Sequence, residues 1–337
     1  MHTHKLFTAA ALATLAACGG TGQSASMEQR SRDAMPRKES VAVATPKSSA
    51  RALRERSGPS SSFTAAEQNS TSGDVSGSYQ LTVSLAAAIN GGVAWTLGLI
   101  ESITDLPPTV CSESACVWGP GSGALDPADW KLEVHHDVAA DLYAYVLSGR
   151  AKAAGDGQFH PVVSGVAKPS AVAHRGSGSF EVDFDQSSAL NANHNDQGQL
   201  HVDYSNAVAG QGHIDAQFLG VRDGEHPGQT LNAAYGFDED ASGGGSLQLA
   251  FRNLNTQDPV ALHSRWKATG AGRGDAAVRF NGGNGSFYQA QVTECWGAPP
   301  FLVTWFHASD PAHLGPDSGK ATDCAFTEAS AATKTAP

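Results

Sequence analysis

Short runs in which apolar and polar residues alternate dominate the sequence from residue 180 onward, and they constrain the fold more than any other feature. Successive side chains of a β-strand point to opposite faces of the sheet, so such runs predict strands with one buried and one solvated face. The apolar positions that share a parity are Phe180, Val182 and Phe184; Leu200, Val202 and Tyr204; Ile214, Ala216 and Phe218; Leu231, Ala233, Tyr235 and Phe237; and Leu247, Leu249 and Phe251.

Turn-forming clusters separate these runs, at residues 155–157, 196–198, 223–224, 243–245 and 281–283. The runs number about ten to twelve after Trp130, and their close spacing leaves no room for intervening helices, so consecutive strands pair antiparallel. An open sheet of that many strands must curl or close. We therefore expect a mainly β fold: a large curved antiparallel up-and-down sheet, either a half-barrel or a closed barrel.

One amphipathic helix precedes the strands. Leu85, Ile89, Val93, Leu97, Ile100 and Ile103 recur every three or four residues, which places them on one helical face. The pair Pro107-Pro108 ends the pattern. We expect this helix to pack on the dry side of the sheet as a core element and not to span a membrane.

The N-terminus resembles a bacterial lipoprotein signal. The apolar run from Leu6 to Ala17 is shorter than the roughly 20 residues that a membrane-spanning helix needs, and it ends in Leu15-Ala16-Ala17-Cys18. In the lipobox that this stretch resembles, the cysteine is acylated and becomes the new N-terminus. The sequence therefore predicts a signal peptide over residues 1–17 and lipidation at Cys18. An ordinary signal peptide beside a stray cysteine is the alternative.

Residues 18–77 are rich in Ser, Ala, Arg and Glu, and Phe63 is the only aromatic residue among them. Such a composition buries too little apolar surface to offset the loss of chain entropy, so we expect a disordered tether. We expect one β-rich domain over residues 78–330 and a disordered tail over 331–337. The arginines of the tether either remain solvated or lie on anionic headgroups.

Four cysteines remain after Cys18. An even number in an exported protein predicts disulfide bonds, and proximity in the sequence favours Cys111–Cys116 and Cys295–Cys324. A four-cysteine zinc site and free thiols are the alternatives.

The sequence offers little chemistry. Its net charge of −11 excludes a generally basic nucleic-acid binder, and the familiar hydrolase, nucleotide and metalloprotease motifs are absent. His201, Asp203, His213 and Asp215 share the wet parity with Asp183, and we interpret them as a solvated face with no metal. His135-His136-Asp137 is a weak indication of a metal site. Arg273-Gly274-Asp275 matches an integrin-binding tripeptide, and we interpret this match as a coincidence in a Gly-rich turn. We expect neither an enzyme nor a cofactor.

Residues at the two ends of the predicted domain carry a resemblance. Trp118-Gly119-Pro120 before the first strand, Glu294-Cys295-Trp296, Thr304-Trp305-Phe306 and Asp323-Cys324-Ala325-Phe326 resemble a group of uncharacterised bacterial envelope lipoproteins, over roughly Val117 to Phe326. More loosely, a lipidated chain with a curved sheet and a covering helix is similar to half-barrel lipoprotein carriers, which is an analogy of fold alone.

Two functions remain open. The resemblance implies a protein tethered by lipid to the bacterial cell envelope. Gly19, in place of an Asp after Cys18, resembles the pattern for export to the outer membrane. The concave apolar face of the sheet would bind a hydrophobic or lipid ligand. The alternative is a structural or interaction lipoprotein with a filled core and no ligand, whose wet face meets protein partners. An enzyme with an unrecognised site and a transmembrane barrel are weaker alternatives.

Overall fold

A computed structural model describes residues 26–46, 71–123, 126–152, 158–191, 196–222, 228–254, 259–281 and 287–337 of the chain. The predicted signal peptide and Cys18 lie outside the described residues. So do most of residues 47–77 and the turn clusters at 155–157, 223–224 and 282–283.

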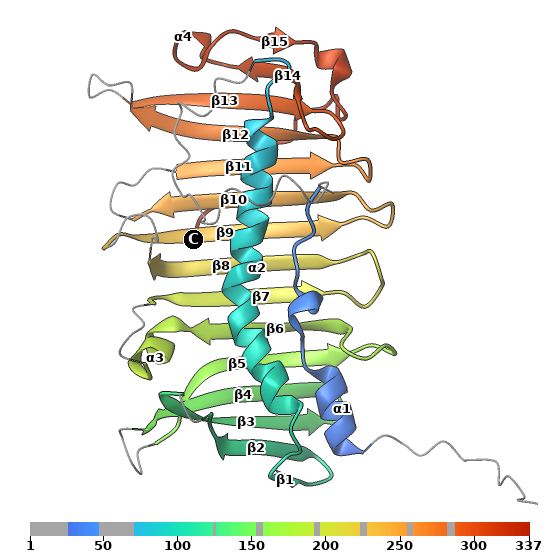
Figure 1. Cartoon of the computed structure of the whole chain (residues 1–337), viewed down its shortest axis with the longest axis vertical. Coiled ribbons are helices and arrows are strands. Elements are labelled where there is room, and N and C mark those ends of the chain that lie inside the picture. Colours follow the sequence, from blue (N-terminus) through green and yellow to red (C-terminus); the bar gives the residue numbers. More distant parts are fainter. Residues whose placement is uncertain are drawn as a thin grey trace, which may run out of the picture.

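The described residues form one sheet of fifteen antiparallel strands that follow each other in sequence order (Figure 1). The strands are β1 (Val110–Cys111), β2 (Ala115–Gly121), β3 (Ala128–Asp137), β4 (Leu142–Ala151), β5 (His160–Pro169), β6 (Gly176–Asp183), β7 (Gln199–Ser205), β8 (His213–Arg222), β9 (Thr230–Glu239), β10 (Gly245–Asn253), β11 (Pro259–Trp266), β12 (Gly272–Asn281), β13 (Phe287–Trp296), β14 (Val303–Ala308) and β15 (Ser318–Gly319). The up-and-down antiparallel topology predicted from the sequence is confirmed.

The sheet does not close into a barrel, so that alternative was wrong. β1 and β15 are its two edges, and each is only two residues long. Closure would bury the apolar face against the far side of the same sheet. Here a helix laid across the strands covers that face instead, and very short edge strands offer little backbone for pairing with another chain.

Alternation along the strands follows the predicted parity. Val182, Leu200, Val202 and Ile214 are buried on the face that the helix covers. One expectation failed at Phe184, where the strand was predicted to continue. Asp183 accepts a hydrogen bond from the Gln186 backbone N–H at 2.8 Å and caps helix α3 (Phe184–Ala189), so the strand ends there.

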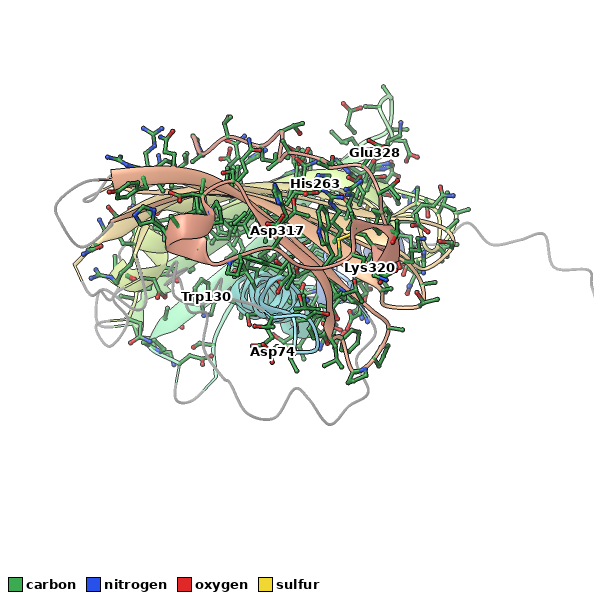
Figure 2. All side chains as sticks on the ribbon, turned by 90° about the horizontal axis from the view of Figure 1, so that it is seen from above. Asp74, Trp130, His263, Asp317, Lys320 and Glu328 are labelled. Carbon is green, nitrogen blue, oxygen red and sulfur yellow. A yellow bond between two sulfur atoms is a disulfide. The ribbon has the colours of Figure 1, made fainter. Side chains whose placement is uncertain are left out.

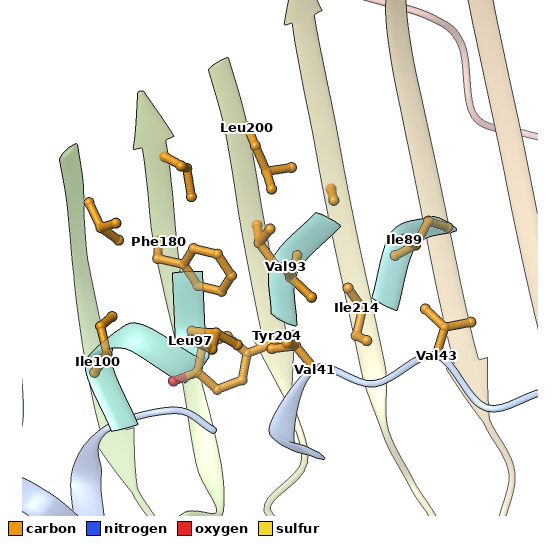
Figure 3. Close-up of a cluster of buried hydrophobic side chains, with 14 of the residues drawn as sticks. Val41, Val43, Ile89, Val93, Leu97, Ile100, Phe180, Leu200, Tyr204 and Ile214 are labelled. Carbon is orange, nitrogen blue, oxygen red and sulfur yellow. The ribbon is translucent and has the colours of Figure 1, made fainter. Parts of the chain in front are cut away.

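The predicted amphipathic helix is α2 (Gly77–Thr104), which crosses the sheet roughly perpendicular to the strands (Figure 1). Its apolar stripe packs on the strands, as predicted from the three- and four-residue spacing. Leu97 and Ile100 are fully buried, and Leu85 and Ile103 lie at the margin of the core. Figure 3 shows Ile89, Val93, Leu97 and Ile100 of the helix among Phe180, Leu200, Tyr204 and Ile214 of the sheet.

A buried carboxylate fixes the start of α2. Glu294 of β13 accepts hydrogen bonds from the Ser76 hydroxyl at 2.9 Å and from the backbone N–H groups of Gly77 and Ser78 at 3.3 and 2.5 Å. These are among the N–H groups that a helix leaves unpaired at its N-terminus, where negative charge is favoured. Gly274 permits this close approach, because a Cβ there would lie 2.8 Å from the Cβ of Ser78.

Residues 26–46, which belong to the predicted tether, form defined elements of structure. Helix α1 (Met27–Ala34), a short 3-10 turn (Lys38–Ser40) and the strand-like stretch after it lie along α2. Val41 and Val43 are buried, and Asn90 of α2 holds the backbone of Val43 by accepting from its N–H at 2.7 Å and donating to its carbonyl at 3.0 Å. These few apolar residues suffice because α2 and the sheet already supply the surface on which they pack.

The structure contains both predicted disulfide bonds, Cys111–Cys116 and Cys295–Cys324. The first joins the edge strand β1 to β2. The second ties the end of the 3-10 turn Ala321–Asp323 to β13, and it fixes the point from which residues 325–337 run back across the sheet. The Trp118-Gly119-Pro120 stretch, expected before the first strand, lies within β2.

Candidate functional site on the polar face of the sheet

The face of the sheet opposite α2 carries the polar residues. Strand register aligns one residue from each of seven neighbouring strands in a continuous line across this face. We call this line the central row; it consists of Asp215, Gly236, Gln248, His263, Asp275, Thr293 and His307. In Figure 2, His263 and Glu328 lie on one side of the sheet and α2 on the other.

Residues 326–337, here called the strap, cross the strands over the central row. Arg273 donates to the carbonyl oxygens of Phe326 and Thr327 at 3.1 and 3.0 Å, and Arg265 donates to that of Glu328 at 2.6 Å. The Arg265 guanidinium also lies over the Phe326 ring, 4.9 Å from its centroid. The sheet thus holds the first part of the strap mainly through its main chain.

The second part of the strap is held in the same way. Gln248 accepts from the N–H and the hydroxyl of Thr333 at 2.8 and 2.9 Å, Asn232 donates to the Pro337 carbonyl at 2.8 Å, and Lys334 pairs with Asp215. Residues 331–337, for which the sequence predicts a disordered tail, form this part of the strap. These residues are mostly Ala, Thr and Lys, and the hydrogen bonds that hold them leave no hydrophobic pattern in the sequence.

An ion pair with little solvent contact lies under the strap. Asp275 lies 2.8 Å from Arg273, whose side chain is 3 % exposed, and it accepts from the Thr293 hydroxyl at 2.8 Å and the Ser330 N–H at 3.1 Å. Arg265 approaches the same carboxylate at 3.3 Å. Arg273-Gly274-Asp275 therefore belongs to β12 and not to a turn, and its charges are engaged within the fold.

His263 lies beside this ion pair. Burial, followed by the nearby charge of Arg265, lowers the pKa of its imidazole. The neutral ring bridges two elements, because Nδ1 lies 3.1 Å from the Ser330 carbonyl oxygen and Nε2 lies 3.2 Å from the Ser246 hydroxyl. Donation from Nδ1 to the carbonyl leaves Nε2 to accept from the hydroxyl.

An acidic stretch with two histidines occupies the polar face of β6 to β9. His201 lies 3.0 Å from Asp203, and His213 lies 2.7 Å from Asp238 and 3.3 Å from Asp215. The hydrogen bond to Asp238 is the largest cause of a raised pKa at His213. Each histidine thus lies beside carboxylates, and no group of three His, Cys, Asp or Glu arranged for a metal occurs among the described residues.

We expect the double variant His201→Gln/His213→Gln to melt at the wild-type temperature at pH 9, with or without chelator. A raised pKa means that the charged His213 ring is favoured in the fold, so this ring stabilises the fold when it is protonated. The stabilisation is complete below the unfolded-state pKa of about 6.5 and is lost as the pH rises through the folded-state pKa. Solvent screening keeps it within about 0.5 kcal/mol at pH 5.5. Thermal melts at both pH values, with Asp238→Asn as the charge control, test this; a chelator-dependent drop of several degrees in wild type alone would reveal a metal site.

A hollow of about 560 Å³ lies beside the strap, over β10 to β13. Its lining includes Arg252, Arg279, Gln289 and Gln291 from the strands and Lys334 from the strap. A smaller hollow of about 200 Å³ lies over β5 to β8 and includes His201 among its lining residues. Neither hollow could be predicted from the sequence, because both depend on strand register.

No protein-family model, curated protein sequence or solved structure matches this chain. Among the described helices, none is by itself long and apolar enough to cross a membrane; the two parts of α2, Gly77–Gly91 and Thr96–Thr104, meet that criterion only together, by length and composition. The functional argument therefore depends on the geometry of this chain and on its N-terminal sequence.

Proposed function

We propose that this protein is a lipid-anchored component of the bacterial cell envelope, at the outer membrane, and that its sheet serves as an interaction module and not as a lipid carrier. The packing under α2 is the observation that favours an interaction module over a lipid carrier. The helix side chains that meet the sheet there, Val93, Leu97 and Ile100, are at most 2 % exposed. Strands and helix are in direct side-chain contact where a carried acyl chain would have to lie.

The polar face supplies the surface for partners. Between β6 and β8 it presents charged side chains to solvent, including Glu181 and Asp203, which are 69 % and 60 % exposed. Specific protein interfaces need about 800 Å² from each partner. An open sheet face several strands wide offers an area of that order without any rearrangement of the core.

The lipid anchor is tested at Cys18. We expect Cys18→Ser to leave the protein soluble in the periplasmic fraction or stalled as the precursor, because the thiol is the atom to which the lipid is attached. Fractionation and an intact mass measurement of the purified protein provide the readout. If the variant were still processed and still sedimented with membranes, the lipoprotein proposal would be wrong.

The interaction module is tested by placing a photo-cross-linking amino acid at Asp203 or Gln217 of the anchored protein in cells. Ser102, exposed on the outer side of α2, is the matched control position. We expect discrete adducts of defined mass from the two sheet positions and none from Ser102. Equal labelling from all three positions would count against a dedicated face.

Carriage of a lipid is the competing outcome, and native mass spectrometry of the detergent-free protein distinguishes it. An interaction module gives the mass of the polypeptide with its N-terminal lipid alone. An additional acyl-containing ligand at one equivalent, removed by organic extraction, would establish a carrier and overturn the proposed function.

A further inference from the structure

The turns that join odd-numbered to even-numbered strands lie at one edge of the sheet, the right-hand edge in Figure 1. Three consecutive turns of this kind carry an exposed valine at the tip: Val138 after β3, Val172 after β5 and Val208 after β7. These side chains are 73 %, 54 % and 56 % exposed, and an exposed alanine follows each of them. The three turns that come next on the same edge carry smaller exposed apolar residues, Ala241, Ala268 and Ala298.

The segments that connect even-numbered to odd-numbered strands differ in sequence. Residues 192–195, 223–227 and 282–286 lie between β6 and β7, β8 and β9, and β12 and β13, and they contain no Val, Leu, Ile, Phe, Tyr or Trp. Apolar tips are thus a property of one set of turns. Neighbouring turns of that set are two strand spacings apart, about 10 Å, so the three valines form a line of about 20 Å along the edge.

The main chain at these tips is hydrogen-bonded within the turns. The Asp137 carboxylate accepts from the N–H groups of Ala139 and Ala140 at 2.9 and 3.2 Å. The Ser170 hydroxyl accepts from the Val172 N–H at 3.2 Å. Because a peptide group without a partner is costly to remove from water, turns whose N–H groups are already paired enter apolar surroundings at a lower cost.

The chain from the predicted lipid attachment site reaches this same edge. The Asp33 carbonyl, near the end of α1, accepts from the His174 N–H at 2.8 Å, and the Ser40 hydroxyl donates to the His174 carbonyl at 2.8 Å. His174 belongs to the turn between β5 and β6. Seven residues separate Cys18 from Ser26, and this stretch spans at most about 29 Å. A lipid on Cys18 would therefore hold this edge of the sheet close to a bilayer.

We propose that this edge docks on the bilayer that holds the lipid, with the valine tips at the level of the headgroups and the strands directed away from the membrane. The inference rests on the proposed lipid anchor. Once the protein is anchored, the edge and the bilayer meet at a high effective concentration, so contacts too weak to bind a free protein suffice to orient a tethered one. In this orientation the polar face of the sheet stays accessible to partners.

Apolar contact and not charge holds the edge. In and beside the three turns, the carboxylates of Asp137 and Asp141 are offset by the cations of Lys168 and Arg175. We therefore expect docking to persist at high salt, where the attraction of a basic surface to anionic lipid would be screened.

The test uses the full lipidated chain in vesicles of phosphatidylethanolamine and phosphatidylglycerol, and flotation of the vesicles shows that the protein is anchored. An environment-sensitive fluorescent amino acid is placed at Ala173 or Ala209, beside two of the valines. Ala189 is the matched control position, because it is exposed and ends α3 at the opposite ends of the strands. We expect a blue shift and quenching by spin-labelled lipid at Ala173 and Ala209 and neither effect at Ala189, at low and at high salt.

The double variant Val172→Asp/Val208→Asp should lose the blue shift and the quenching and should still float with the vesicles, because the lipid remains. Gln186→Asp/Ala189→Asp adds two carboxylates at the opposite end of the strands and should keep both signals at Ala209. Thermal melts should show that both variants are folded.

Flotation separates a failure of this inference from a failure of the lipid anchor. A protein that floats while Ala173 and Ala209 stay unquenched, or are quenched no more than Ala189, would retain its anchor and overturn the docking. A protein that does not float would overturn both. A blue shift at Ala209 in the Cys18→Ser protein without vesicles would indicate that the edge contacts a second copy of the chain, and this would also overturn docking on the bilayer.

Discussion

Replacing Glu294 by alanine is expected to lower the free energy of unfolding by about 3–5 kcal/mol, because three donors lose their acceptor in one step. The Ser76 hydroxyl and the N–H groups of Gly77 and Ser78 all donate to this carboxylate, which is 3 % exposed. Water cannot replace the lost acceptor without opening the contact between α2 and β13. Urea denaturation followed by far-UV circular dichroism gives the value.

Glu181→Ala provides the matched control on the same sheet, since that glutamate is 69 % exposed and should cost less than about 0.5 kcal/mol. Glu294→Gln should fall between the two, because one amide oxygen can still accept while the amide NH₂ group faces donors. Losses of similar size for Glu294→Ala and Glu181→Ala would show that the carboxylate does not anchor the helix.

The second large effect is expected at the ion pair under the strap. Asp275→Ala leaves the Arg273 guanidinium buried without its counter-charge, which costs about 3–5 kcal/mol for a pair of this kind. The same change removes the acceptor for the Ser330 N–H. We therefore expect lower stability in urea together with faster hydrogen exchange at the Ser330 amide.

Two further variants separate charge burial from a general packing defect. Asp203→Ala, at an exposed carboxylate on the same face, should change neither measurement. Arg273→Met/Asp275→Leu should be less destabilised than Asp275→Ala, because no charge is left buried. If Ser330 exchanged at the wild-type rate in Asp275→Ala, the strap would not depend on this carboxylate.

The fold could be predicted where the burial of one face leaves a pattern in the side chains. Alternation on β6 to β10 and the three- and four-residue spacing in α2 both follow from burial of one face, so strand order and helix position were readable from the sequence. Whether the sheet closes could not be predicted. The same alternation occurs in an open sheet whose apolar face is covered by a helix and in a barrel whose apolar face is turned inward.

The order of the strap could not be predicted, because it depends largely on main-chain contacts. The strap is held mainly through its carbonyl and N–H groups, which every residue possesses, so its sequence resembles a tail. Glu294 did carry a signal that was missed: it shares the buried parity of β13 with Val292 and Trp296, and an acid at such a position needs donors. Asp275 carried no such signal, since it lies on the polar face of the sheet, beneath the strap.

The up-and-down order of the strands has a consequence for how the molecule comes apart. Each inner strand pairs only with its neighbours in the sequence, so a bare sheet of this kind would behave as a one-dimensional array that frays from either edge, much as repeat proteins do. α2 runs across the array on one face. The loop after its C-terminal end is joined to β2, because the Trp118 indole N–H donates to the Leu106 carbonyl at 2.9 Å. The strap does the same over β8 to β12 on the other face. These two crossing segments convert local pairings into a single cooperative unit, so the stability of each edge depends on side chains many strands away.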